Sequence, residues 1–126
     1  MRKGGEYRSV DPLQKALSML TRVEMKGWLR SFWTDIRGAS TRDGHPAPYP
    51  VELAERLIRL FSFAGDTVLD PFAGTGSTAL AAAAAGRNSI SNEIDAKYFE
   101  TAYRRLIVSC GQMGMVGAVH AEVTVG

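Results

Sequence analysis

The chain has 126 residues, of which 45% are hydrophobic and 22% are charged, as in an ordinary soluble domain. Its formal net charge of +2 is too small to demonstrate a polyanionic partner. The single cysteine, Cys110, excludes an internal disulfide and disfavours a cysteine-based metal site. No apolar run approaches the roughly 18 residues of a membrane span, and no signal-peptide pattern follows Met1, so we expect a cytoplasmic protein without membrane contact.

Residues 1–36 are predicted to form an N-terminal segment of short helices and irregular chain. Asp11 precedes a proline, which indicates a helix start with a capping carboxylate. Thr21 and Glu24 have the spacing of a capping box, which predicts a second short helix. The aromatic and β-branched run at residues 31–36 favours a short extended piece.

Basic and aromatic side chains are interleaved in and just after this segment. The basic residues are Arg22, Lys26, Arg30, Arg37 and Arg42, and the aromatic ones are Trp28, Phe32 and Trp33. Two interpretations stay open. The arginines form a strip that meets DNA phosphates, or they form a solvated face while the aromatic rings lie in the core.

Residues 37–110 are predicted to form an α/β core that begins with a loop. The loop, residues 37–50, contains two glycines and three prolines, which suppress regular structure, and Pro50 then suits a helix start. The following helix is expected to present one apolar face, made of Leu53, Ala54, Leu57, Ile58 and Phe61. Its charged residues are expected to point elsewhere; they are Glu52, Glu55, Arg56 and Arg59.

The clearest unit follows this helix. It comprises a strand at 67–70, a glycine turn at 72–76, an alanine-rich helix at 77–85 stopped by Gly86, a strand at 88–93, and a helix at about 96–108 capped by Asp95. This order is the beginning of a doubly wound parallel sheet. In the tail, residues 111–126, the stretch 118–125 is either a third strand or a frayed end.

The glycine turn has the features of a nucleotide-binding site. Gly74, Gly76 and Ala79 fit the glycine fingerprint, and Glu93 ends the next strand 17 residues after Gly76, near the roughly 20 expected of a ribose-binding carboxylate. Asp70 stands directly before the turn. There it would repel a dinucleotide pyrophosphate and attract the ammonium and sulfonium groups of S-adenosylmethionine. The charges therefore favour S-adenosylmethionine over NAD, with a simple turn cap as the alternative role for Asp70.

Three segments resemble motifs of the DNA N6-adenine/N4-cytosine methyltransferases. Residues 70–78 resemble motif I, residues 93–98 resemble motif II, and residues 44–53 resemble motif X. Motif X precedes motif I, as in the β-type arrangement of that family. The resemblance covers residues 30–108 and extends upstream in 3–29. It implies part of a three-layer, Rossmann-like methyltransferase sheet.

The same resemblance implies a set of cofactor-binding residues. They are Ser40, Thr41 and His45 from motif X, Asp70, Phe72, Gly74, Gly76, Ser77 and Thr78 from motif I, and Glu93 and Ile94 from motif II. Glu93 is expected to hold the ribose and Ile94 to pack on the adenine. The motif X residues are expected near the carboxylate end of the cofactor, with capping of their own loop as the alternative.

One family motif has no counterpart in these residues. The family's catalytic Asp-Pro-Pro-Tyr type motif receives the target amine. Of the two Asp-Pro pairs here, the one at Asp11 lacks the second proline and the aromatic residue, and the one at Asp70 belongs to the cofactor turn. We therefore assign no catalytic residue. Without the catalytic strand, residues 67–70 are expected to form an open apolar edge that invites a partner chain or self-association.

The leading hypothesis is the S-adenosylmethionine-binding part of a site-specific DNA methyltransferase, inactive alone. It would belong to a truncated coding sequence or to a split enzyme whose other chain supplies the catalytic motif, and double-stranded DNA would be the substrate of the complete enzyme. A non-catalytic assembly module that pairs with a methyltransferase is the alternative from another class. An NAD-type dehydrogenase fragment is a third, disfavoured by Asp70.

Overall fold

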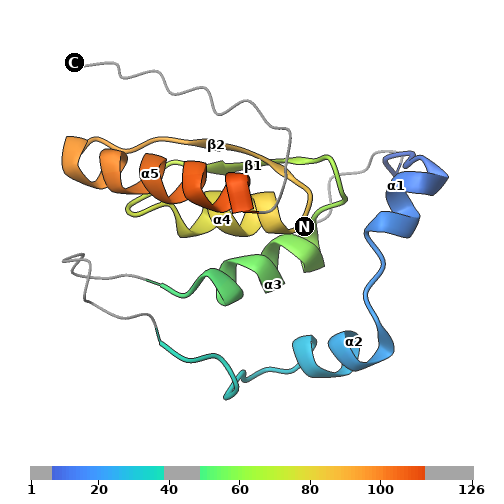
Figure 1. Ribbon diagram of the computed structural model, residues 1–126. Coiled ribbons are helices and arrows are strands. Elements are labelled where there is room, and N and C mark those ends of the chain that lie inside the picture. Colours follow the sequence, from blue (N-terminus) through green and yellow to red (C-terminus); the bar gives the residue numbers. More distant parts are fainter. Residues whose placement is uncertain (1–6, 39–48, 113–126) are drawn as a thin grey trace.

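The computed structural model describes residues 7–38 and 49–112 (Figure 1). The elements are α1 (Pro12–Leu17), α2 (Arg22–Trp28), α3 (Val51–Phe61), β1 (Thr67–Asp70), α4 (Ser77–Ala84), β2 (Asn88–Ser91) and α5 (Ala96–Gln112). The predicted strand–turn–helix–strand–helix unit is therefore present from β1 to α5. The predicted tail strand at 118–125 lies outside the described residues. Within the described ranges, no helix is long and apolar enough to span a membrane.

The first two helices differ in how they begin. At α2 the predicted capping box is confirmed, because Thr21 Oγ1 accepts from the Glu24 amide at 3.1 Å and Glu24 Oε2 accepts from the Thr21 amide at 2.7 Å. At α1 the predicted cap is wrong, because the Asp11 side chain makes no capping bond. The predicted extended piece at 31–36 is irregular chain, since the described sheet pairs only β1 with β2 and offers it no neighbour.

Polar contacts attach α1 to the turn between α3 and β1. The Arg8 guanidinium binds both carboxylate oxygens of Asp66, at 2.6 and 3.0 Å. Gln14 Nε2 donates to the Ala64 carbonyl at 2.7 Å, and Ser18 Oγ accepts from the Ala64 amide at the same distance. The hydrogen bonds from Arg8 and from the Phe63 amide hold the pKa of Asp66 below its ordinary value, so the carboxylate keeps its charge and this link at pH values below the ordinary aspartate pKa.

Arg56 on α3 is buried, contrary to the prediction that it points away from the apolar face. Its side chain lies between the rings of Trp28 and Trp33, with the guanidinium carbon 5.6 and 5.5 Å from their centroids. Its nitrogens donate to Asp35 at 2.6 and 3.1 Å and to Glu52 at 2.7 Å. A guanidinium can be buried in this way because its flat faces contact aromatic rings while its two terminal nitrogens keep charged acceptors; the buried Nε of Arg56 has no partner among the described residues.

The sheet is parallel, with Thr67 paired with Asn88 and Asp70 with Ser91. Helix α4 connects the two strands and packs against both of them and against α3 (Figure 1). Gly86, at φ 71°, follows the end of α4, as predicted. Helix α5 continues to Gln112, four residues beyond its predicted end.

The buried core is small and lies between α3 and α4. It consists of Ala54, Ile58, Ala81 and Ala82. Val68 of β1 packs against this cluster, so strand alternation places Leu69 on the opposite face of the sheet. Leu69 and its register partner Ile90 are 65% and 57% exposed. Phe61, predicted in the apolar face of α3, is exposed as well.

Candidate cofactor-binding site

The candidate site lies at the carboxyl ends of β1 and β2, where parallel α/β sheets generally bind ligands. Two backbone bonds join these ends across the sheet: the Asn92 amide donates to the Asp70 carbonyl, and the Ala73 amide donates to the Asn92 carbonyl, both at 2.9 Å. The glycine turn is thereby held against the end of β2. Asp70 and Glu93, both predicted site residues, therefore stand at the ends of neighbouring strands.

Asp70 uses only one of its carboxylate oxygens within the described structure. Oδ1 accepts from the Phe72 amide at 3.0 Å, which fixes the carboxylate at the start of the turn. Oδ2 is buried and has no hydrogen-bond partner among the described residues. A buried carboxylate oxygen without a donor is costly, so its position favours a ligand that brings a donor or a positive charge.

Tyr49 lies beside this carboxylate, although we did not predict it as a site residue. Its hydroxyl hydrogen-bonds to Thr78 Oγ1 at the start of α4. Burial raises the pKa of the Tyr49 phenol, the bond to Thr78 opposes the rise, and the negative charge and close approach of the Asp70 carboxylate add to it, although the hydroxyl makes no hydrogen bond of good geometry to Asp70 Oδ2. The only sequence signal for Tyr49 was its place in motif X, directly before α3.

Glu93 closes the turn from the side of β2. One carboxylate oxygen accepts from the Gly74 amide at 2.7 Å, and the other accepts from the Asp95 amide at 2.9 Å. Asp95 in turn caps α5, as predicted, by accepting from the Lys97 amide at 2.8 Å. Each Glu93 oxygen retains a free lone pair beyond these bonds, which is the capacity that ribose hydroxyls would use.

The two predicted glycines have different structural roles. Gly74 has φ 53° and presents its amide to Glu93. Gly76 has φ 84° and is buried against α5, where an added Cβ would lie 2.9 Å from the Cβ of Ala102. Ser77 is buried beside it, at the first position of α4. Gly76 therefore allows α4 and α5 to approach closely, in addition to forming the turn.

Two apolar side chains flank the turn and stand in solvent. Phe72 is 85% exposed and Ile94 is essentially fully exposed. They extend from the two strand ends, one on the motif I side and one on the motif II side. Ser40, Thr41 and His45 lie outside the described residues.

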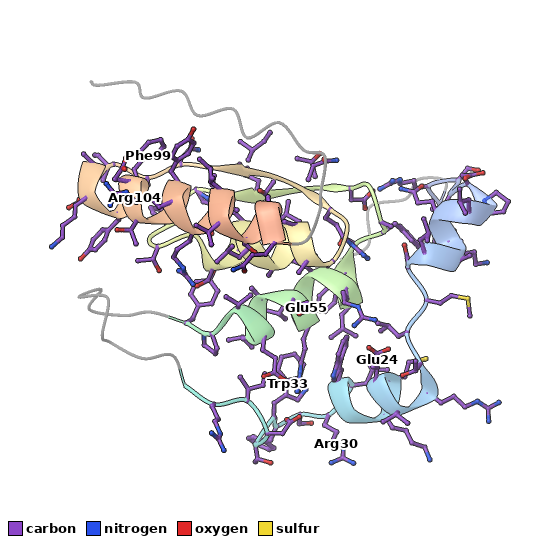
Figure 2. The ribbon with its side chains drawn as sticks, viewed as in Figure 1. Glu24, Arg30, Trp33, Glu55, Phe99 and Arg104 are labelled. Atoms are coloured by element: carbon purple, nitrogen blue, oxygen red, sulfur yellow. The ribbon has the colours of Figure 1, made fainter. Side chains whose placement is uncertain are left out.

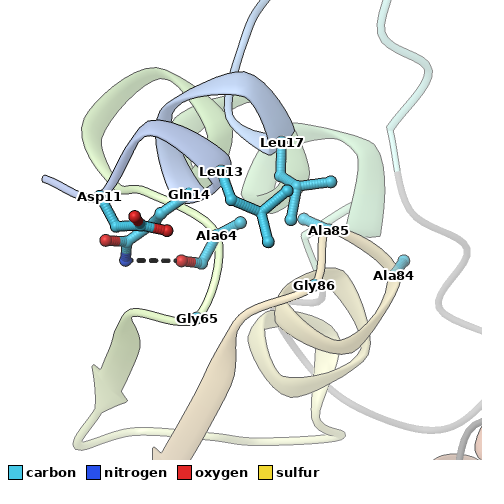
Figure 3. A pocket seen from close by; sticks show the side chains of 9 residues that line it. All are labelled: Asp11, Leu13, Gln14, Leu17, Ala64, Gly65, Ala84, Ala85 and Gly86. Carbon is cyan, nitrogen blue, oxygen red and sulfur yellow. Dashed lines mark hydrogen bonds between the residues drawn. The ribbon is translucent and has the colours of Figure 1, made fainter.

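One cavity lies away from this constellation. It has a volume of about 620 Å³ and is found between α1, the turn before β1 and the end of α4 (Figure 3). Leu13 and Leu17 are among its apolar lining residues, and Gln14, which also lines it, donates to the Ala64 carbonyl. These elements lie at the amino ends of the strands, so the cavity is not part of the candidate site. The described residues contain no cluster of three metal-ligating side chains.

Comparison with known proteins places this arrangement in one family. The family model described as DNA methylase matches residues 2–104. The chain is 53% identical over 78 residues to the type II methyltransferase M.MthZI of Methanothermobacter thermautotrophicus, covering 57% of this chain and 22% of that protein. It is 43% identical over 96 residues to M.MjaI of Methanocaldococcus jannaschii, covering 74% of this chain and 31% of that protein.

Solved structures give the same result. The putative DNA modification methylase TTHA0409 of Thermus thermophilus, solved in complex with S-adenosyl-L-methionine, superposes with a TM-score of 0.72 at 42% identity, over 86% of this chain and 41% of that one. The complex of M1.HpyAVI with S-adenosylmethionine superposes with a TM-score of 0.55 at 36% identity, over 62% and 38% of the two chains.

An α/β sheet with a glycine turn and two carboxylates at its strand ends is the arrangement typical of nucleotide-type cofactor sites. More specifically, this chain belongs to the DNA N6/N4 methylase family, as its motif order predicted. The chain spans less than a third of the length of the curated relatives described above.

Proposed function

We propose that this chain binds S-adenosylmethionine at the carboxyl ends of β1 and β2 as the cofactor-binding part of a DNA methyltransferase. The observation that carries the proposal is the buried Oδ2 of Asp70, which lacks a donor among the described residues. The ammonium group of the cofactor would supply a charged donor there. That two relatives were solved with this cofactor supports the proposal.

The other residues of the site fit the same ligand. Glu93 would accept from the ribose hydroxyls through the lone pairs that the Gly74 and Asp95 amides leave free. Ile94 and Phe72 would pack on the adenine and its surroundings, which would cover their exposed surfaces. Ser77 and Thr78 would line the start of α4, and the loop with Ser40, Thr41 and His45 would approach the methionine end.

NAD fits these residues less well. Its pyrophosphate would occupy the start of α4, where it would meet the unpaired carboxylate oxygen of Asp70. A phosphate and a carboxylate that lie close together in a partly buried site repel each other strongly. S-adenosylmethionine carries no phosphate and therefore avoids this repulsion.

The reaction that we propose for the complete protein is methyl transfer to adenine N6 or cytosine N4 in double-stranded DNA. The bound cofactor would supply an electrophilic methyl group, and the target base would leave the helix to reach it. The 126 residues contain no Asp-Pro-Pro-Tyr type tetrapeptide. We therefore propose that the residues that receive the target amine come from another segment or another chain.

A non-catalytic module that assembles with a methyltransferase is the second candidate, favoured by the exposed pair Leu69 and Ile90 on the sheet. Coexpression with a family member that carries the catalytic motif separates the two. Methylation that depends on both chains supports the split enzyme. Methylation by the partner alone, unchanged by this chain, supports the assembly module.

Calorimetric titration of the full chain tests cofactor choice. We expect saturable heat with S-adenosylmethionine and none with NAD. Heat with NAD but none with S-adenosylmethionine would overturn the assignment.

A further inference from the structure

The segment after α1 carries an excess of positive charge that the fold does not neutralise. Within residues 22–38 the basic side chains are Arg22, Lys26, Arg30 and Arg37, and all four are exposed. The acidic side chains there are Glu24 and Asp35. None of the four basic side chains forms an ion pair with a carboxylate among the described residues.

Both acidic side chains are paired with arginines of α3 instead. Glu24 binds Arg59 at 2.7 Å, and Asp35 binds Arg56 at 2.6 Å. Figure 2 shows this division: Glu24 and Trp33 lie on the side of the segment that faces α3, while Arg30 points away from it. The internal pairing therefore engages both acidic side chains, while the four exposed basic side chains of the segment form no ion pair among the described residues.

Most of the other basic side chains among the described residues form ion pairs or are at least half-buried, unlike the four in the segment 22–38. Arg8 and Arg104 form ion pairs, as Arg56 and Arg59 do. Arg87 and Arg105 donate to backbone carbonyls, as Arg30 does, but Arg87 is buried and Arg105 is half-buried whereas Arg30 is exposed. Lys15 and Lys97 are exposed without such partners, but they stand singly on α1 and α5.

Three of the unpaired basic residues lie near one another along α2 and just beyond its end. Arg22 and Lys26 are four residues apart on α2, and Arg30, two residues beyond the helix end at Trp28, is held next to them because its Nε donates to the Lys26 carbonyl. Like charges at this spacing on a helix repel each other and destabilise it. A strip of this kind therefore favours an anionic partner that relieves the repulsion.

A groove of about 510 Å³ continues this strip toward the start of α3. Arg30 and Arg37 line it together with Phe32 and Trp33. Trp33 is held in place by Arg56, but Phe32 is 84% exposed. Two cations and an exposed ring that line one groove match a polymer that alternates phosphates with flat, apolar units.

We propose that the outer side of α2 and this groove bind the phosphate backbone of DNA, with Arg22, Lys26, Arg30 and Arg37 as the phosphate contacts and Phe32 against a sugar or base. We call these five residues the basic strip. The proposal rests on the proposed function, in that DNA is its substrate. It adds the surface of this chain that would hold the DNA backbone.

Anisotropy titrations of the full chain with a short fluorescein-labelled duplex, at about 50 to 200 mM salt, test the basic strip. Each phosphate contact contributes about 0.9 to the slope of log affinity against log salt. The double variant Arg30→Gln/Arg37→Gln should therefore lower the slope by about 1.8 and weaken binding at least about tenfold at low salt. Phe32→Ala should weaken binding several-fold without changing the slope.

The matched control is Lys15→Gln/Lys97→Gln, which removes the same charge from exposed sites on α1 and α5. We expect it to leave the slope within about half a unit of the wild-type value. An equal loss in both double variants would show that only overall charge matters and would overturn the proposal. So would duplex binding that neither double variant changes, or a wild-type chain that does not bind the duplex.

Two further experiments test whether the anionic partner is DNA or a membrane surface, and whether cofactor binding is independent of the basic strip. The chain should bind vesicles containing phosphatidylserine more weakly than the duplex. If it binds the vesicles as tightly as the duplex, and this binding also depends on Arg30 and Arg37, the partner of the basic strip is a membrane surface and not DNA. Calorimetry with S-adenosylmethionine on the double variant should match wild type. Cofactor binding without duplex binding overturns the basic strip alone, whereas strip-dependent duplex binding without cofactor binding overturns the proposed function alone.

Discussion

Gly76 shows how a single position serves both the turn and the packing of two helices. Its φ of 84° lies in the left-handed region, and a Cβ there would lie 2.9 Å from the Cβ of Ala102. Gly86 has a similar φ of 71°, but nothing lies within 4 Å of a Cβ at that position. An alanine at Gly86 would therefore meet only an unfavourable backbone conformation, whereas an alanine at Gly76 would meet that conformation and a steric clash as well.

We predict that Gly76→Ala destabilises the chain more than Gly86→Ala does. Both variants incur about 1–2 kcal/mol for a left-handed alanine. Gly76→Ala should add about 1–3 kcal/mol, because α5 must move to admit the methyl group. Urea unfolding followed by circular dichroism measures the difference, and equal midpoints for the two variants would contradict the packing role of Gly76.

Asp70, Glu93 and Tyr49 differ in how well sequence alone identifies them. Asp70 ends one predicted strand and Glu93 ends the next, and both strands are visible in the local sequence pattern, so their positions at neighbouring strand ends were predictable. The role of Tyr49 depends on contact with Thr78, 29 residues later in the chain. Such a contact depends on how α3 packs beside α4, which no local pattern specifies.

Among the elements, local signals predicted most boundaries. The capping box of α2 and the glycine after α4 are interactions within one or two turns of chain, so sequence spacing determines them. The irregular chain at 31–36 and the burial of Arg56 were not predicted. Strand formation needs a partner strand, and the burial of Arg56 needs two tryptophans supplied by a separate segment.

Arg56 connects the segment 22–38 to α3, and this gives a prediction for the two elements. Arg56→Ala should destabilise their contact by about 1–3 kcal/mol, because it removes two cation–π contacts and a buried aliphatic stem. Trypsin should then cleave the segment 22–38 faster than in wild type.

Arg104→Ala is the control, because its ion pair with Glu100 lies on the exposed surface of α5 (Figure 2). We expect it to change stability by less than about 0.5 kcal/mol and to leave cleavage of that segment unchanged. Equal cleavage rates for Arg56→Ala and wild type would refute the anchoring role of Arg56.

For the molecule as a whole, the core is small relative to its exposed apolar surface. The buried cluster contains three alanines and Ile58, whereas Leu69 and Ile90 form an exposed pair on the outer face of the sheet. Each strand also has an unpaired edge within the described sheet. Exposed apolar sheet faces and open edges favour association.

We therefore predict that the chain on its own self-associates through the sheet. Leu69→Ser/Ile90→Ser should shift sedimentation toward monomer, whereas Ile107→Ser/Val108→Ser, at similar exposure on α5, should not. A wild-type chain that sediments as a monomer at all concentrations and melts cooperatively would contradict this prediction.

The central claim is that the Asp70 carboxylate recognises a cationic cofactor at the end of β1. Its most direct test is the affinity of Asp70→Asn for S-adenosylmethionine, because asparagine keeps the size of the side chain and removes its charge. We predict a loss of about 10- to 100-fold, the range of a charge-assisted hydrogen bond, while Glu100→Gln on α5 binds as wild type. Unchanged affinity in Asp70→Asn would contradict the claim.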